Sequence, residues 1–541
     1  MFRVLRTPAH VKTSTSPGSA AGGGAGQIRW RLWLWPVLVL DGLAVALLAW
    51  VWSVERDQRQ DQVVATMAVT GATAILLVLW TLSWLLLLSR MRWRARLAGS
   101  AAIVTGLALA PAVLEIRGVS GDVMPVLGWR WSGEAAAATE GPAAARRSAP
   151  VTASAHDFPQ FQGPSRDGRV PGVRLTRDWS APPRVRWRRP VGAGWSGFAV
   201  AGAYAVTQEQ RGEDELVTCY DRLTGELLWA HADRTRWDDP LGGPGPRATP
   251  AIHGGRVYAL GASGVLNALD LGSGALLWSR NVLVDAAASP PAYGVSASPL
   301  VLDGYVVAAV GGTEGQALVG YDAETGVRRW SGGSGGPAYG SPRQAVLAGA
   351  PQILVLNSGA VAAHDPGNGR VLWEFAWPSG TEMTFTPLVL PGDRVFVSTG
   401  YGVGGKLLQV RSGGEGAVVD LLWESRGLKS KFSNVVYHDG FLYGLDDGIL
   451  VCLDPATGER RWKEGRHGHG QLLLVDDLLL VLGESGEVAL VEARPAARRE
   501  LGSFTALAGK TWNPPALAGS ELFVRNDREA ACYELPLAGA R

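Results

Sequence analysis

Five copies of a nine-residue unit constrain the fold of this chain more than any other feature of its sequence. The unit reads Asp-x-x-x-Gly-x-x-x-Trp, and a β-rich run, a Gly-containing turn and a second alternating run precede each copy, as in GGRVYALGASGVLNALD. Four short strands with turn glycines, recurring roughly every 40–50 residues, are typical of one β-propeller blade. The copies end at Trp229, Trp278, Trp330, Trp373 and Trp462.

Each residue type in the unit has a structural reason. We expect the Asp carboxylate to cap the turn between the third and fourth strands, and the Gly to supply a positive φ in that turn. The Trp offers a flat apolar face against which the neighbouring blade packs. The aspartates are Asp221, Asp270, Asp322, Asp365 and Asp454, and the glycines are Gly225, Gly274, Gly326, Gly369 and Gly458.

Weaker copies and the two ends of the repeat region set the number of blades. Residues 421–423 end a unit whose turn is altered to RSGGEGAVVD, and residues 488–501 lack both the Gly and the Trp. A strand ending at Trp187 has no strands of its own ahead of it, whereas ELFVRNDREAACYEL near the C-terminus has no Trp strand after it. The early strand therefore closes the last blade and removes free sheet edges. We predict an all-β, eight-bladed propeller of four-stranded antiparallel blades over residues 157–541, or seven blades if residues 488–501 form a loop.

Three apolar runs precede the repeats and are long enough to cross a bilayer. They span residues 32–52, 63–88 and 97–114, and together they predict a module of three transmembrane helices over residues 28–114. Residues 1–27 read as disordered, and residues 115–156 as a juxtamembrane segment and linker. Asp41 falls within the first run, where a carboxylate either transfers protons or is simply paired between helices.

Arginine placement predicts the orientation of this module. Arg29 and Arg31 precede the first run, and Arg90, Arg92, Arg94 and Arg96 fill the loop between the second and third. The positive-inside rule then puts the N-terminus in the cytoplasm and the propeller outside it. A cleaved signal peptide is the competing interpretation, disfavoured by the number of runs.

Charge and cysteine content exclude several classes of protein. The net charge of +2 argues against a nucleic-acid surface. The cysteines are Cys219, Cys452 and Cys532, and each stands two residues before the blade Asp or its Glu534 equivalent. Ala268, Gly320 and Ala363 fill that slot in other repeats, so we expect buried structural cysteines with no thiol chemistry.

The repeat unit resembles the tryptophan-docking repeat of quinoprotein-type, PQQ-like propellers. This bacterial family includes dehydrogenases that use pyrroloquinoline quinone (PQQ) and the propeller lipoprotein of the Bam complex. The segments FPQFQGPSRDG (158–168) and IRGVSGDVMPVLGWRW (116–131) also resemble parts of such proteins. The resemblance implies a bacterial inner-membrane protein with a periplasmic propeller. The chain departs from alcohol dehydrogenases of the family in having neither adjacent cysteines nor Cys-x-x-Cys-His.

A candidate site follows from the register of the repeats, because residues entering the first strand of each blade ring the axial funnel. Arg247, Lys431 and Lys510 are cations that could face an anion such as PQQ, with Trp195 or Trp512 stacking on its rings and Asn434 beside them. Glu382, Asn434 and Asn513 offer oxygen ligands for calcium. His467 and His469 read as a solvated turn, and a hydrated funnel without any ligand is the alternative for the whole ring.

Two functions remain in competition. The favoured one is a non-catalytic, membrane-anchored scaffold or binding protein of the cell envelope, with a protein or peptide partner on the propeller rim. The other is a PQQ- and calcium-dependent dehydrogenase that oxidises an alcohol or sugar and reduces membrane quinone. No Asp emerges as a general base, since the obvious aspartates belong to the turn unit, so the binding protein is preferred.

Overall fold

The computed structural model describes residues 42, 63–122, 125–131, 154–312, 315–336, 339–379, 383–414 and 416–539. It divides into two units, residues 1–112 and residues 113–541.

The first unit contains two long apolar helices among its described residues, where the sequence predicted three. Helix α2 (Val63–Ser83) runs on into a π-helical turn, η3 (Trp84–Leu88), and helix α3 (Trp93–Val113) follows. Both are long and apolar enough to cross a membrane. They correspond to the predicted second and third runs, although α3 begins at Trp93 rather than at residue 97. Except for Gly42, the predicted first run, with Asp41, lies outside the described residues.

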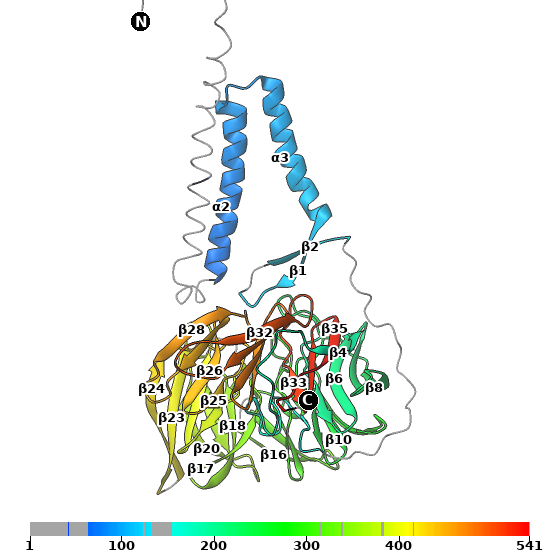
Figure 1. The fold of residues 1–541 in the computed structure, drawn as a ribbon, viewed down its shortest axis with the longest axis vertical. Helices are drawn as coiled ribbons and strands as arrows, with labels where there is room; N and C mark the ends of the chain where they lie inside the picture. Colours follow the sequence, from blue (N-terminus) through cyan, green and yellow to red (C-terminus); the bar gives the residue numbers. More distant parts are fainter. Residues whose placement is uncertain are drawn as a thin grey trace, which may run out of the picture. The chain divides into compact units, whose positions relative to one another are not determined.

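The second unit is built from four-stranded antiparallel sheets that follow one another along the chain (Figure 1). Seven sheets have four strands: β5 (Ala199–Ala201), β6 (Tyr204–Arg211), β7 (Asp214–Asp221) and β8 (Leu227–Asp233); β9 (Ala251–His253), β10 (Arg256–Leu260), β11 (Val265–Asp270) and β12 (Leu276–Asn281); β13 (Leu300–Leu302), β14 (Tyr305–Ala309), β15 (Leu318–Asp322) and β16 (Arg328–Gly332); β17 (Arg343–Leu347), β18 (Ala350–Asn357), β19 (Ala360–His364) and β20 (Val371–Ala376); β21 (Leu388–Leu390), β22 (Arg394–Thr399), β23 (Gly404–Gly413) and β24 (Gly416–Ser425); β25 (Val436–His438), β26 (Phe441–Asp446), β27 (Ile449–Leu453) and β28 (Arg460–Arg466); β33 (Ala516–Ala518), β34 (Glu521–Arg525), β35 (Glu529–Glu534) and β4 (Arg184–Pro190).

The eighth sheet has five strands, because a short strand from earlier in the chain joins it. It contains β29 (Gln471–Val475), β30 (Leu478–Leu482), β31 (Glu487–Glu492) and β32 (Glu500–Thr505), with β3 (Arg169–Val170) parallel to β29. The degenerate unit at residues 488–501 is thus a sheet and not a loop. A short helix, α4 (Val282–Asp285), follows β12, and a separate hairpin of β1 (Leu114–Val119) and β2 (Pro125–Trp129) precedes all eight sheets.

The early strand β4 closes the last blade, as the sequence predicted. It pairs antiparallel with β35, and Trp187 stands opposite Cys532. Cys219 faces Trp229 and Cys452 faces Trp462 in the same way. All three cysteines are free and buried, which confirms the structural role expected of them.

Several docking tryptophans join one blade to the next, whereas the indole of Trp373 donates to Gln352 within its own sheet. The indole Nε1 of Trp229 donates to the Leu271 carbonyl at 2.9 Å, and that of Trp278 donates to the Ala323 carbonyl at 3.1 Å. Gly274, at φ +71°, lies under the Trp229 ring, and a Cβ built there would be 2.5 Å from its Cε3. Gly is therefore needed at this position of the unit for two reasons, its positive φ and the close approach of the Trp ring. Only the positive φ was evident from the sequence.

The eighth sheet lacks a docking Trp of its own and receives one from elsewhere. Gly502 pairs with Leu490, at the register position where other fourth strands carry the Trp. Trp179, which precedes β4, packs on Gly502 and lies 5.9 Å from the Phe504 ring. Because the pattern Asp-x-x-x-Gly-x-x-x-Trp is absent here, this substitution was not visible in the sequence.

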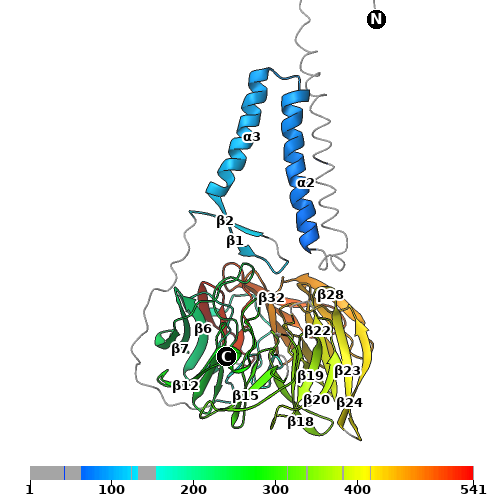
Figure 2. The ribbon, with the colours of Figure 1, turned by 180° about the vertical axis from the view of Figure 1, so that it is seen from behind.

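Residues 158–176, here called the crossing segment, pass along the first strands of several blades. Phe158 bridges Val200, the Pro159 carbonyl accepts from Ile252 N, and the Gly168 carbonyl accepts from Leu474 N. Arg166 is fully buried and donates to the carbonyls of Ser298 and Pro299. The crossing segment thus connects blades that are distant in sequence. Figure 2 shows the same sheets from behind.

Candidate functional site

The residues of the predicted funnel ring form hydrogen bonds between neighbouring blades. Residues entering the first strands use their side chains to bind the backbone of the adjacent blade. Thr249 Oγ1 accepts from Gly197 N at 3.0 Å, Ser298 Oγ accepts from Thr249 N at 2.9 Å, and Ser341 Oγ accepts from Ser298 N at 2.9 Å. The predicted register of the ring is therefore right, and its small polar residues hold blades together.

The two asparagines expected to bind calcium also form hydrogen bonds between blades. Asn434 Oδ1 accepts from Thr386 N at 2.8 Å, and Asn513 Nδ2 donates to the carbonyls of Gly194 and Ser196 at 3.0 and 2.8 Å. They serve different pairs of blades, and Glu382, the third predicted ligand, lies outside the described residues. Among the residues that are described, no three His, Cys, Asp or Glu side chains gather as a metal site. Asn434 and Asn513 therefore join different blades, and calcium binding by them stays a prediction.

The Arg247 side chain binds the loop that precedes it. Its guanidinium forms an ion pair with Asp239 and donates to the carbonyls of Gly243 (2.7 Å) and Gly245. Burial is the main reason that the pKa of Arg247 is lowered. Trp195 Nε1 donates to Gly242 of the same loop at 2.5 Å. These contacts fix residues 237–247 against the funnel.

Lys510 lies between two indoles. Its Nζ is 4.1 Å from the Trp512 ring centroid and 4.8 Å from that of Trp195. The two rings are 4.9 Å apart and inclined at 45°, so they pack on each other and do not form an open parallel slot. Burial lowers the pKa of Lys510, and the ring faces stabilise its charged form.

The turn of the β1–β2 hairpin occupies the part of the ring around Lys431. Lys431 Nζ donates to the Gly121 carbonyl at 2.5 Å, and Gly121 N donates to Glu484 Oε1 at 2.5 Å. Asp122 Oδ1 lies 3.0 Å from His469 Nε2. The solvated turn predicted at His467 and His469 is wrong for His469, which is buried and bonded to Asp122. Sequence could not reveal this contact, since the hairpin lies far upstream of the repeats.

Each of the three predicted cations thus has a partner within the chain. Arg247 pairs with Asp239, Lys431 binds Gly121, and Lys510 contacts the indoles. PQQ carries three carboxylates. The three cations of this ring already contact groups of the chain itself, so they are not available together to bind those carboxylates. The arrangement therefore does not fit PQQ in the predicted pose.

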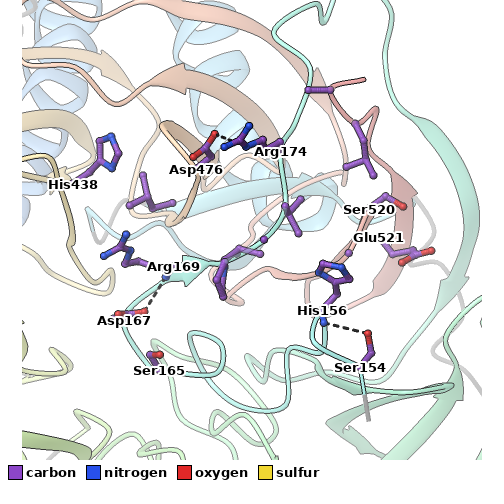
Figure 3. A pocket seen from close by; sticks show the side chains of 18 of the residues that line it. Ser154, His156, Ser165, Asp167, Arg169, Arg174, His438, Asp476, Ser520 and Glu521 are labelled. Carbon is purple, nitrogen blue, oxygen red and sulfur yellow. Dashed lines mark hydrogen bonds and ion pairs between the residues drawn. The ribbon is translucent and has the colours of Figure 1, made fainter. Parts of the chain in front are cut away.

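A second polar concavity lies where the first strands end. It has a volume of about 970 Å³ and is lined by the crossing segment together with the ends of β25 and β29 and the residues that follow β33 (Figure 3). Arg174 approaches Asp476 at 3.6 Å, and Arg222 pairs with Glu521 at 2.7 Å. His156 and His438 also line it. Sequence reasoning missed this cavity because it depends on the path of the crossing segment.

Eight blade-like sheets, docking tryptophans and closure by β4 define a tryptophan-docked β-propeller. Residues 213–464 match the family model described as outer membrane protein assembly factor BamB. Over these residues the propeller is similar to this PQQ-like, BamB-related family. A comparison with curated proteins finds no match.

Solved structures share the fold at low sequence identity. Quinohemoprotein alcohol dehydrogenase from Comamonas testosteroni is 13% identical, with a TM-score of 0.51 over 71% of this chain and 81% of that one. A quinohemoprotein alcohol dehydrogenase from Pseudomonas putida HK5 is 14% identical, with a TM-score of 0.50 over 72% and 81%. BamB from Moraxella catarrhalis is 15% identical, with a TM-score of 0.47 over 65% and 100%. These likenesses concern the fold alone.

Proposed function

We propose that this chain is a membrane-anchored binding or scaffold protein of the bacterial cell envelope, with no catalytic activity of its own. The observation that carries the proposal is the state of the funnel ring. Its charged side chains bind the chain's own backbone and carboxylates, and its asparagines join blades. A ring used in this way supports a rigid platform, and fold alone does not imply an enzyme.

Helices α2 and α3 support the anchoring part of the proposal, since each is long enough to span the hydrocarbon core. The arginines of residues 90–96, between these helices, favour a cytoplasmic position for that loop, and we therefore propose a periplasmic propeller. The partner that we propose is a protein or peptide bound at the propeller surface.

The alternative is a PQQ- and calcium-dependent dehydrogenase acting on an alcohol or sugar and reducing membrane quinone. It is favoured by one observation, the cluster of Lys510 with Trp195 and Trp512, which has the cation and aromatic surfaces that a quinone ligand would use. The fold shared with quinohemoprotein alcohol dehydrogenases is compatible with it.

A titration of the full chain in detergent with PQQ and calcium separates the two functions. Tryptophan fluorescence reports binding, because Trp195 and Trp512 lie in the ring, and dye reduction over a panel of alcohols and sugars reports turnover. We expect neither binding nor turnover at high micromolar PQQ. Saturable binding that is lost in Lys510→Ala, retained in the exposed control Arg411→Ala, and accompanied by dye reduction would overturn the binding-protein proposal.

Partner binding needs its own test. A photo-crosslinking amino acid placed at exposed Leu223 or Val327 on the propeller surface should give a discrete crosslinked species in intact cells. The same species from both positions, identified by mass spectrometry, would support the proposal. Absence of any specific crosslink from a set of surface positions covering every blade would count against it.

A further inference from the structure

The β1–β2 hairpin is attached to the propeller through its turn. Its two strands pair with each other and with no blade. Along the strands Ile116, Leu127 and Trp129 are exposed, whereas Gly121 in the turn is buried. An isolated two-stranded hairpin is marginally stable in water, so the hydrogen bonds at its turn are needed to hold it against the propeller.

The turn is held by three polar contacts, to Lys431 and His469 of the ring and to Glu484, which follows β30. The Gly121 amide donates to Glu484, the Gly121 carbonyl accepts from Lys431, and the Asp122 carboxylate contacts His469. Lys431 is 2% exposed and His469 is 3% exposed. Buried charged and polar groups of this kind are costly unless they are bonded, so the pocket is built to bind a turn.

Bonds within the propeller hold the pocket residues in place without the hairpin. Trp512 Nε1 and His469 N donate to the two carboxylate oxygens of Glu484, at 2.9 and 3.1 Å. The Lys431 ammonium lies 4.6 Å from the Tyr401 ring centroid and 5.4 Å from that of Phe432. The geometry of the pocket is therefore set before any turn enters it.

The pocket is specific for the two residues that it holds. A Cβ on Gly121 would lie 2.3 Å from His469 Cδ2, so a larger residue cannot occupy this position without displacing the imidazole. Asp122 presents its carboxylate to His469, and this hydrogen bond is the main reason that the pKa of Asp122 is lowered. A Gly followed by Asp in a turn satisfies every group of the pocket.

We propose that this pocket is a recognition site for Gly-Asp turns, and that the β1–β2 hairpin is its resident occupant, displaced when a partner protein presents the same turn. The inference rests on the proposed binding function and names the chemistry of the partner. The Asp122 side chain is 49% exposed, so a competitor can reach the edge of the contact. Occupation by the hairpin lowers the apparent affinity for a partner, because only the fraction of pockets that the hairpin leaves open can bind.

The test uses the full chain in detergent and a fluorescein-labelled synthetic peptide with the sequence of residues 114–130. In the Gly121→Val chain the hairpin cannot enter the pocket, and fluorescence anisotropy should show peptide affinity raised by about tenfold or more over the wild-type chain. A peptide carrying the same Gly→Val change should not bind. Asp122→Ala, which adds no bulk, should raise affinity for the unmodified peptide by a smaller factor.

Variants in the pocket test whether the peptide binds there. Adding Lys431→Ala to Gly121→Val should weaken peptide binding by about ten- to a hundred-fold, since a charged donor is lost. Adding Lys406→Ala, a lysine paired with Glu424 on β24, should leave it unchanged. Circular dichroism and melting temperature verify that each variant is folded.

Two outcomes would overturn the proposal: equal peptide affinity in the wild-type and Gly121→Val chains, or binding unaffected by Lys431→Ala. Neither bears on crosslinking at the propeller surface, so the binding function could stand without the turn site. Conversely, peptide binding with no cellular crosslink would leave the turn site in place and refute the wider function.

Discussion

Trp179 packs against the backbone of Gly502, at the point where the fourth strand of other blades carries its own docking tryptophan. A side chain from outside the repeats thus fills a position that the eighth sheet left empty. Trp179 is buried and its ring lies beside Phe504. The degenerate blade is complete only because the chain before β4 folds back over it.

Replacing Trp179 by Ala should lower the free energy of unfolding by about 3–5 kcal/mol, because a large buried ring is removed. Gly502→Ala should also destabilise, since its Cβ would be 2.8 Å from Trp179 Cβ and 3.1 Å from the Trp179 carbonyl oxygen. Gly414→Ala, where nothing lies within 4 Å, is the matched control. Denaturant titration measures all three, and equal effects of the two glycine variants would refute this account of Gly502.

Gly274→Ala should cost more than a positive φ alone explains. Its Cβ would overlap the Trp229 ring, so we expect a loss of about 2–4 kcal/mol from combined backbone strain and overpacking. Gly255→Ala in the same blade has φ +74° and an open surrounding, and should lose only about 1 kcal/mol. Melting temperatures of the two variants compare them directly, and similar losses would show that the ring contact contributes nothing.

Asn513→Ala should lower stability by about 1–3 kcal/mol, because two buried carbonyls lose their donor. Asn368, in an exposed turn, is the control and should lose less than about 1 kcal/mol on replacement by Ala. Chelation of calcium should leave the wild-type melting temperature unchanged, since Asn434 and Asn513 join blades. A chelator-induced fall that disappears in Asn513→Ala would instead identify Asn513 as a calcium ligand.

Glu215 predicts a pH-dependent stability. Burial is the largest cause that raises its pKa from 4.5 to about 7. Between pH 4.5 and 7 the folded chain keeps a proton that the unfolded chain has released, so the free energy of unfolding falls as pH rises through this window, by up to about 3 kcal/mol. Glu215→Gln should therefore be more stable than wild type at pH 8 and similar at pH 4.5.

Urea titrations at the two pH values measure this effect. The exposed control Glu424→Gln should leave the pH dependence as in the wild type. If the free energy of unfolding changes equally between pH 4.5 and pH 8 in the wild type and in Glu215→Gln, burial does not raise the pKa of the Glu215 carboxyl.

Sequence predicted the parts of this molecule that depend on local repetition. The Asp turns form as expected: Asp221 Oδ1 accepts from Leu223 N and Thr224 N at 3.0 and 2.8 Å. The register of the funnel ring, the structural cysteines and the closure by β4 follow from the same periodicity. Each of these is set by spacing within a blade or between successive blades.

Contacts between segments that share no period could not be predicted. Trp179 on Gly502, Gly121 against His469, and Arg166 bonded to Ser298 all join the repeats to chain that precedes them. The intrachain partners of Lys431 and Asn513 could not be predicted for the same reason, since they lie 310 and 319 positions away. Residue type indicated a polar ring, whereas the partner of each side chain depended on the tertiary fold.

The pairing of β4 with β35 can form only late in synthesis of the chain. Arg184 and Glu534, which meet across this pair, are 350 positions apart. A ribosome must therefore complete seven sheets before β4 finds its neighbour β35, and throughout that interval Trp187 and an unpaired strand edge remain available to other chains. Chaperones of such a nascent chain have to protect one strand while seven sheets are made, and a stalled or shortened product would carry an open ring prone to aggregation.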